Sequence, residues 1–204
     1  MARVGYQNSG KSAARCVRRS GSVGGRFQTT TAREMISDFS PLKYLAVFPI
    51  HLYIEAMKIY LDICSMNRVF DDQSQPRIFL ESSAMITILA MVENKSFSLV
   101  SSEVLRFENS RNPFEERRIF VSSVLAHAKL VQTINPTLLT RAQQIESVNG
   151  ISGLDALHLA CGEKLKCAYF VTCDDRILRR YKGVVKAINP IQFTIEVMKE
   201  SENA

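Results

Sequence analysis

The sequence predicts an α/β fold in which helices flank a parallel sheet. From Met57 onward, short apolar runs alternate with longer amphipathic segments, which is the pattern of consecutive βα units. The clearest run, residues 168–172 (AYFVT), is too short for a helix and contains residues suited to a buried parallel strand. Just before it, Leu154, Leu157, Ala160, Cys161 and Leu165 recur at intervals of three and four, which predicts a helix with one buried face.

The other elements follow from similar signals. Pro76, the pair Asn112 and Pro113, and Pro136 favour helix starts, and the pair Asn149 and Gly150 favours a helix end. We expect strands at residues 58–64, 97–101, 129–133, 168–172 and 184–188. We expect helices at residues 76–94, 103–109, 112–128, 136–148 and 191–199. The helix at 76–94 is expected to bury Phe79, Leu80, Ile86, Leu89 and Ala90.

Residues 1–56 differ in composition from the rest of the chain. They hold eight Lys and Arg against three Asp and Glu, so five of the six net positive charges lie there, and overall basicity does not indicate a polyanion partner. We expect residues 1–56 to lie outside the fold, with Met57 as the natural initiator and a transit or anchoring segment as the alternative. Residues 57–199 then form the domain, and residues 200–204 form a short tail.

Two segments of this extension resemble functional motifs. Residues 5–12 (GYQNSGKS) fit the phosphate-binding loop pattern, but no buried strand precedes them and glycines break the following segment, so we predict no ATP site. Residues 42–54 are apolar but too short to cross a bilayer, and they follow a polar stretch that is wrong for a secretory signal. We therefore expect no membrane partner.

The cysteines indicate a reducing compartment. Their number, five, is odd, no CxxC occurs, and most of them lie in apolar runs, so we predict a cytoplasmic protein without a disulfide framework. A zinc site of His158, Cys161, Cys167 and Cys173 is the alternative, but the spacing matches no zinc motif.

Four acids are candidates for a functional site. Asp62 lies among the apolar residues of the first strand, where a charge is costly without a partner. Glu103 follows the second strand, Asp155 opens a helix, and Asp174 follows residues 168–172. Acids at the carboxyl ends of parallel strands converge on one place, which is where such sheets bind ligands.

These segments resemble the PIN-domain nucleases, and the resemblance covers residues 57–199. It rests on YLD in the first strand, SSEVLRFE after the second, GLDALHLA, and FVTCDD. The resemblance implies a Rossmann-like fold, three or four carboxylates that hold Mg²⁺ or Mn²⁺, and hydrolysis of RNA phosphodiester bonds. Many members of the family are VapC-type toxins that dimerise and pair with an antitoxin, so RNA, an antitoxin and a second copy of the chain are expected partners.

The chain departs from the family after Asp62, where many members have a small polar residue and Asn two positions on. Ser65 or Asn67 could replace that polar partner. Thr172 and Asp175 are further candidates for supporting the site or contacting substrate. They also form a capping pattern, as Ser152 and Asp155 do, so Asp155 and Asp175 could serve only to cap helices. Glu103 and Asp174 could likewise serve only the helix dipole.

Two functions follow as alternatives. The first is a metal-dependent endoribonuclease in which Asp62, Glu103, Asp155 and Asp174 bind the metal; the chain contains no GxSxG or HExxH motif that would indicate other hydrolytic chemistry. The second is a PIN fold that binds RNA or a partner protein without cleavage. His158 is expected either to pack in the core or to contact the site residues without binding the metal itself.

Overall fold

The computed structural model of the protein describes residues 57–151 and 153–202, with only the backbone for residues 201 and 202. The predictions for residues 1–56, including residues 5–12 and 42–54, lie outside the described residues, as does the capping role of Ser152. No helix in the described ranges is long and apolar enough to cross a membrane.

The centre of the domain is a five-stranded parallel sheet, as the sequence predicts. Its strand order is β3-β2-β1-β4-β5, with bounds β1 Lys58–Leu61, β2 Ser98–Ser102, β3 Leu130–Gln132, β4 Tyr169–Val171 and β5 Lys186–Ile188. β1 is central, and its Tyr60 is opposite Val100 of β2 and Phe170 of β4. The chain builds outward on one side from β1 to β3 and then crosses to β4, so the strand order reverses between β1 and β4. Ligand sites form beside such a reversal, at the carboxyl ends of the strands.

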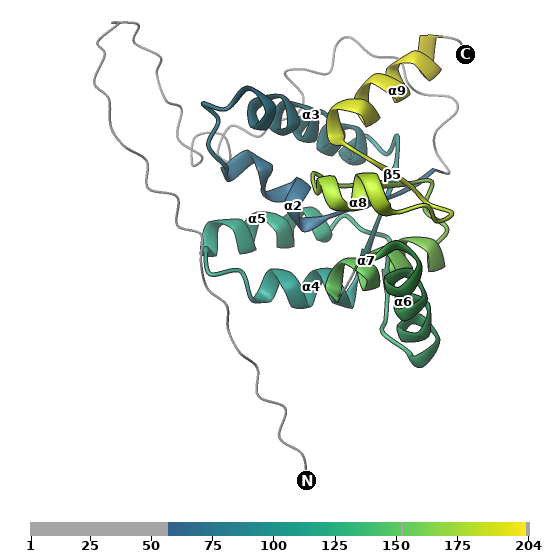
Figure 1. Cartoon of the computed structure of the whole chain (residues 1–204). Helices are drawn as coiled ribbons and strands as arrows, with labels where there is room; N and C mark the ends of the chain where they lie inside the picture. The colour runs from purple at the N-terminus through teal and green to yellow at the C-terminus, as the bar shows by residue number, and fades with distance from the viewer. Residues whose placement is uncertain (1–56, 152, 203–204) are drawn as a thin grey trace, which may run out of the picture.

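Helices cover both faces of this sheet (Figure 1). Their bounds are α2 Ile63–Met66, the 3-10 turn η2 Asn67–Phe70, α3 Pro76–Glu93, α4 Glu103–Ser110, α5 Glu115–Leu125, α6 Pro136–Asn149, α7 Leu154–Lys164, α8 Asp175–Arg180 and α9 Pro190–Glu202. α3 packs with α9 on one face, and α6 packs with α7 on the other. α9 continues through residues 200–202, which the sequence assigned to the tail.

Successive side chains of a strand point to opposite faces of the sheet, and they pack against the helices on each face. Tyr169 points towards α9, where its ring meets Phe193 at 5.1 Å, whereas the next residue, Phe170, stacks on Tyr60 at 5.2 Å. Gly162 of α7 lies over Phe170, and a Cβ at this glycine would be 3.6 Å from that ring. α7 therefore lies directly over the central strands, which brings its first turn to their carboxyl ends.

Several boundaries differ from the predictions. β1 ends at Leu61 and Asp62 takes the N-cap position of α2, so Asp62 is not inside a strand. α5 begins at Glu115, because Asn112 uses its Oδ1 to accept a hydrogen bond from Phe114 N and so forms a turn before the helix. The predicted end of α6 is confirmed: Gly150 adopts φ 65° and donates to Glu146 O.

The predicted buried face of α3 is wrong in part. Phe79, Leu80 and Ile86 are exposed, whereas Leu89 is buried. The helix has apolar residues on most of its circumference, and only the face towards α9, η2 and α2 is covered.

A buried carboxylate in α3 explains part of this orientation. Glu81 accepts hydrogen bonds from Arg68 at 2.6 Å, Arg77 at 2.8 Å and Asn189 at 2.7 Å. Burial alone would raise the pKa of Glu81, but these bonds and the charge of Arg68 hold it below its ordinary value. The network ties α3 to η2 and to the start of α9.

Candidate metal centre

Asp62 is the acid at the end of the central strand, and its carboxylate is held on one side by the protein. Its backbone N–H donates to Val171 O at 3.0 Å, which continues the pairing of β1 with β4. Its Oδ2 accepts hydrogen bonds from Thr172 Oγ1 at 2.7 Å and Cys64 Sγ at 3.1 Å. The side chain makes no cap bond to α2. Asp62 is therefore a fixed, nearly buried carboxylate that does not serve the helix it precedes.

Glu108 on α4 lies next to Asp62, and the sequence did not predict it as a site residue. Asp62, Glu108 and His158 each offer a ligand atom, and these atoms all lie within 4.8 Å of one another. A signal for Glu108 was present: it follows the buried Val104 by four residues and the buried Leu105 by three, so it shares their face of the helix. It is also the last acid of SSEVLRFE.

Glu103, which the sequence analysis named as a site residue, binds a neighbouring loop instead of Asp62. It occupies the first turn of α4, and its Oε2 accepts a hydrogen bond from Ile134 N at 2.7 Å. Ile134 belongs to the connection between β3 and α6, so Glu103 fixes that connection. It is not a member of the group formed by Asp62, Glu108 and His158.

A buried chain of hydrogen bonds orients Glu108. Ser102 caps α4 by accepting from Leu105 N, and its Oγ lies 2.7 Å from Tyr60 Oη. Tyr60 Oη lies 2.7 Å from His158 Nδ1, and His158 Nε2 lies 2.7 Å from Glu108 Oε2. Burial, above all, raises the pKa of Tyr60 well above its ordinary value, so the phenol keeps its proton at neutral pH. His158 is thus a buried support for Glu108.

Asp155 and Asp174 share a cation. Arg176 Nη2 lies 3.0 Å from Asp155 Oδ2 and 2.6 Å from Asp174 Oδ2. Burial raises the pKa of Asp155, and the negative charges of Asp62 and Asp174 raise it further against the opposing charge of Arg176. The side chain of Arg176 lowers the pKa of Asp174. Asp155 is therefore close enough to Asp62 and to Asp174 to be repelled by both.

The cap of α8 differs from the expected one. The helix begins at Asp175, and its N-cap is Asp174, whose Oδ1 accepts from Arg176 N at 2.7 Å. Thr172 Oγ1 accepts instead from Asp174 N while it donates to Asp62. Thr172 therefore links two acids of the site, and the predicted capping box of Thr172 and Asp175 is wrong.

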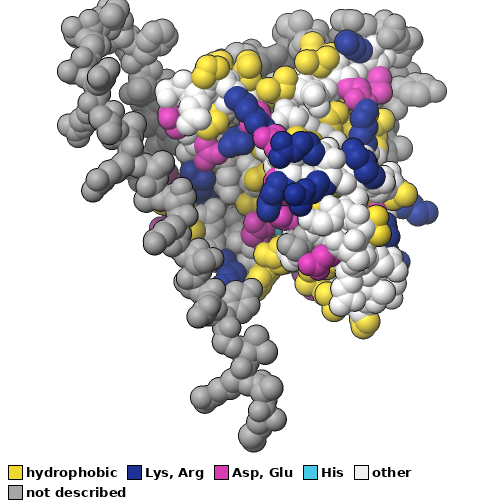
Figure 2. All heavy atoms as spheres, viewed as in Figure 1, with side chains coloured by type: hydrophobic (Ala, Val, Ile, Leu, Met, Phe, Trp, Pro, Cys, Tyr) yellow, Lys and Arg dark blue, Asp and Glu magenta, His cyan; other side chains and the backbone are white. Residues whose placement is uncertain are grey.

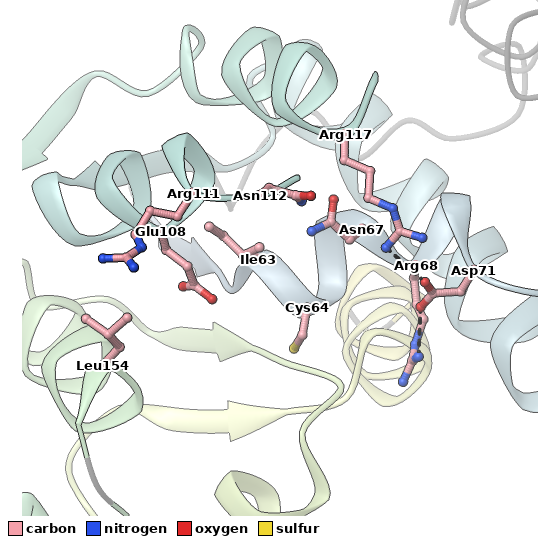
Figure 3. Close-up of a pocket in the computed structure, with 10 residues that line it drawn as sticks. All are labelled: Ile63, Cys64, Asn67, Arg68, Asp71, Glu108, Arg111, Asn112, Arg117 and Leu154. Atoms are coloured by element: carbon pink, nitrogen blue, oxygen red, sulfur yellow. Dashed lines mark hydrogen bonds and ion pairs between the residues drawn. The ribbon is translucent and has the colours of Figure 1, made fainter. Parts of the chain in front are cut away.

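The remaining predicted residues, Ser65, Asp175 and Asn67, have different contacts around this centre. Ser65 Oγ donates to Val171 O at 3.1 Å and so fastens α2 to β4. Asp175 forms two hydrogen bonds with Arg77 of α3, at 2.7 and 2.8 Å, on the exposed surface. Asn67 lines an open pocket of about 520 Å³ beside Glu108 (Figure 3).

The donor set suits a divalent cation. Asp62, Glu108, Asp155 and Asp174 offer carboxylate oxygens, the ligands that Mg²⁺ and Mn²⁺ prefer, whereas both ring nitrogens of His158 are engaged by Tyr60 and Glu108. Arg176 supplies part of the positive charge that Asp155 and Asp174 would otherwise receive from a metal ion. Figure 2 shows basic and acidic side chains closely mixed on this face of the molecule.

Comparison with known proteins identifies a family. The family model described as PIN domain matches residues 59–183, which confirms the resemblance inferred from the sequence. Among solved structures, VapBC2 from Rickettsia felis bound to a DNA fragment from their promoter is similar, with 12% sequence identity and a TM-score of 0.43 over 65% of this chain and 98% of that chain. None of the curated proteins compared with this chain matches it.

Proposed function

This chain belongs to the PIN domain family, and we propose that it is a metal-dependent endoribonuclease that hydrolyses RNA phosphodiester bonds with Mg²⁺ or Mn²⁺. The observation that carries the proposal is the gathering of acids from separate chain segments at the carboxyl ends of the central strands: Asp62, Glu108, Asp155 and Asp174. Glu108 replaces Glu103 in this set, because Glu103 binds Ile134 N instead.

The residues of the site have distinct roles in this proposal. A bound divalent cation supplies an activated water and offsets charge on the scissile phosphate. Asp62 and Glu108 would hold it, each fixed by its own partners: Thr172 for Asp62 and His158 for Glu108. Asp155 and Asp174 would hold the cation or its waters. Arg176, released from those carboxylates, is placed to bind a phosphate oxygen.

One observation favours the second function, a PIN fold that binds RNA or a protein without cleavage. Arg176 already pairs with Asp155 and Asp174, so these two acids share a counter-charge without a metal. A role as a toxin, with an antitoxin partner and a homodimer, is a prediction from the family resemblance. The exposed apolar side chains of Phe79, Leu80 and Ile86 on α3 support a protein partner.

A cleavage assay separates the two functions. Labelled RNA is incubated with the full chain while Mg²⁺ or Mn²⁺ is titrated, and the same experiment is run with Asp62→Asn and Glu108→Gln. We expect metal-dependent cleavage that both variants lose. Asp175→Asn is the matched control, because Asp175 pairs with Arg77 outside the site. RNA binding without cleavage by the unmodified chain would favour the binding module.

A further inference from the structure

The outer face of α3 carries no charge along most of its length. Residues 78–92 contain one charged residue, Glu81, and its side chain is buried. On the outside, Phe79 is 55% exposed, Leu80 52% and Ile86 39%. Figure 2 shows hydrophobic side chains gathered over this helix. A surface helix normally has polar residues on its outer face, so this face is typical of one that another segment covers.

The hydroxyl groups on this face do not need water as a partner. Ser83 Oγ donates to Phe79 O at 2.8 Å, and Thr87 Oγ1 donates to Ser83 O at 3.1 Å. Both hydroxyls therefore bond to the backbone one turn earlier in the helix. Covering them leaves no hydroxyl proton unpaired, so it adds no penalty for an unsatisfied buried donor. The face is suited to an apolar segment with few charges.

The chain enters the domain near the carboxyl end of this helix. Met57 O accepts a hydrogen bond from Ser98 N at 2.9 Å, and only a short connection separates Ser98 from Glu93, the last residue of α3. Within this connection, Ser96 N donates to Met91 O at 2.9 Å, which folds the chain back onto the end of the helix. The residues that precede Met57 are therefore tethered beside α3.

The segment that is tethered there is apolar and long enough to cover the face. Residues 42–54 (LKYLAVFPIHLYI) lie outside the described residues and are joined to Met57 through Glu55 and Ala56. They contain one charged residue, Lys43. α3, with 18 residues, is about 27 Å long, whereas 13 residues span about 20 Å as a helix and about 43 Å when extended. The segment can reach most or all of the face in either form.

We propose that residues 42–54 cover the outer face of α3 in the 204-residue chain. A second copy or a partner protein could use the same face, but a segment on a short tether has an effective concentration of about 1 mM. A second copy at micromolar concentration must therefore bind about a thousand-fold more tightly to compete. Residues 42–54 then pack on the domain although they supply no strand, which departs from the expectation for residues 1–56. This docking does not depend on the nuclease function.

A single tryptophan reports whether the face is covered. The chain contains no Trp, so Phe79→Trp gives the full chain one reporter on α3. We expect blue-shifted emission and weak quenching by acrylamide, as for a covered side chain, although the described residues alone leave position 79 half exposed. Val47→Asp combined with Leu52→Asp places two charges in the covering segment. This double variant should shift the emission to the red and raise the quenching.

Two controls accompany this experiment. Met35→Asp combined with Phe39→Asp adds the same charges outside residues 42–54 and should leave the reporter on α3 unchanged. Phe114→Trp places the reporter on α5, where the side chain is 60% exposed, and its quenching should not respond to the charges at positions 47 and 52. Thermal unfolding checks that each variant folds, and Ile86→Trp serves as a second reporter on the same face.

Three results would overturn the proposal. Free quenching of both α3 reporters before any charge is added would show that the face is bare. Protection that survives Val47→Asp combined with Leu52→Asp would show that another group covers the face. Protection that rises with protein concentration, together with a doubled mass in light scattering, would identify that group as a second copy of the chain.

Discussion

Arg176 binds the Asp174 carboxylate twice, once through its guanidinium and once through its backbone N–H. Nη2 lies 2.6 Å from Asp174 Oδ2, and the backbone N–H donates to Asp174 Oδ1 at 2.7 Å. Because Nη2 also reaches Asp155 at 3.0 Å, one cation bridges two acids that belong to different helices. A metal that uses either acid must compete with this arginine.

Replacement of Arg176 should therefore tighten metal binding. In Arg176→Gln the two acids lose their internal cation, and the apparent Kd for Mn²⁺ should fall about two- to five-fold, the scale of exposed ion pairs. Isothermal titration calorimetry with Mn²⁺ alone measures this. Arg179→Gln changes the charge of the same helix at an exposed position and should have a smaller effect. Weaker binding in Arg176→Gln would show that the arginine does not compete with the metal.

Glu108 and Glu103 should differ in their effect on metal binding. Mn²⁺ at a hundred times its Kd should raise the free energy of unfolding by about 2.7 kcal/mol if it binds only the native state. Glu103→Gln should keep this gain, since the amide oxygen can still accept from Ile134 N. Glu108→Gln should lose most of it, although its amide can still contact His158. Chemical denaturation with and without Mn²⁺ gives the comparison, and the reverse pattern would restore Glu103 to the site.

The hydroxyl of Tyr60 should support both the fold and the metal centre. Tyr60→Phe leaves Ser102 and His158 short of a buried partner, which should cost about 1–3 kcal/mol of unfolding free energy. It should also weaken Mn²⁺ binding, because His158 then orients Glu108 less well. Tyr169→Phe is the control: its hydroxyl donates to Glu196, which keeps Lys186 at 2.6 Å. Equal losses of metal affinity in both variants would exclude a specific role for the Tyr60 chain.

The charge of Asp155 should destabilise the metal-free protein at neutral pH. Its folded pKa is raised, mainly by burial, so the folded state holds this proton more tightly than the unfolded chain does. The unmodified protein should therefore lose stability relative to Asp155→Asn as pH rises from about 3.9, the unfolded value, through the higher folded value. Denaturation in EDTA across pH 3–7 measures the difference, and a gap that closes as pH rises would contradict the assignment.

Most of the fold could be predicted from the sequence, because strand and helix periods are local signals. The strands at residues 58–61 and 169–171 lie within the predicted runs, and Gly150 ends α6 as expected. The side of α3 that faces the core was harder to predict. Phe79 and Leu80 are as apolar as Leu89, and only the packing of α9 and the buried Glu81 decide which of them is covered.

The places of some candidate site residues in the fold could be predicted from the sequence, and those of others could not. Asp62 and Asp174 follow from strand order, since a residue just after a parallel strand lies at the shared edge of the sheet, whereas Asp155 opens α7. Glu108 lies six residues beyond the strand, so its position depends on the rotation of α4 and on the partner His158. The bridge from Arg176 to Asp155 joins residues 21 positions apart, and no local pattern signals it.

Asp174 should have two separable roles, one as a helix cap and one as a charge. Its Oδ1 caps α8 by accepting from Arg176 N, and asparagine caps helices about as well as aspartate. Asp174→Asn should therefore keep the cap and lose the charge, whereas Asp174→Ala loses both and should cost about 1 kcal/mol more of unfolding free energy. The pKa of Asp174 is lowered in the folded state, so its charge contributes stability above about pH 3.9 that disappears as pH falls through the folded value. Both variants should bind Mn²⁺ more weakly than the unmodified chain, and by a similar factor. Denaturation and calorimetry in parallel give the two readouts, and full metal affinity in Asp174→Asn would mean that only the cap matters at this position.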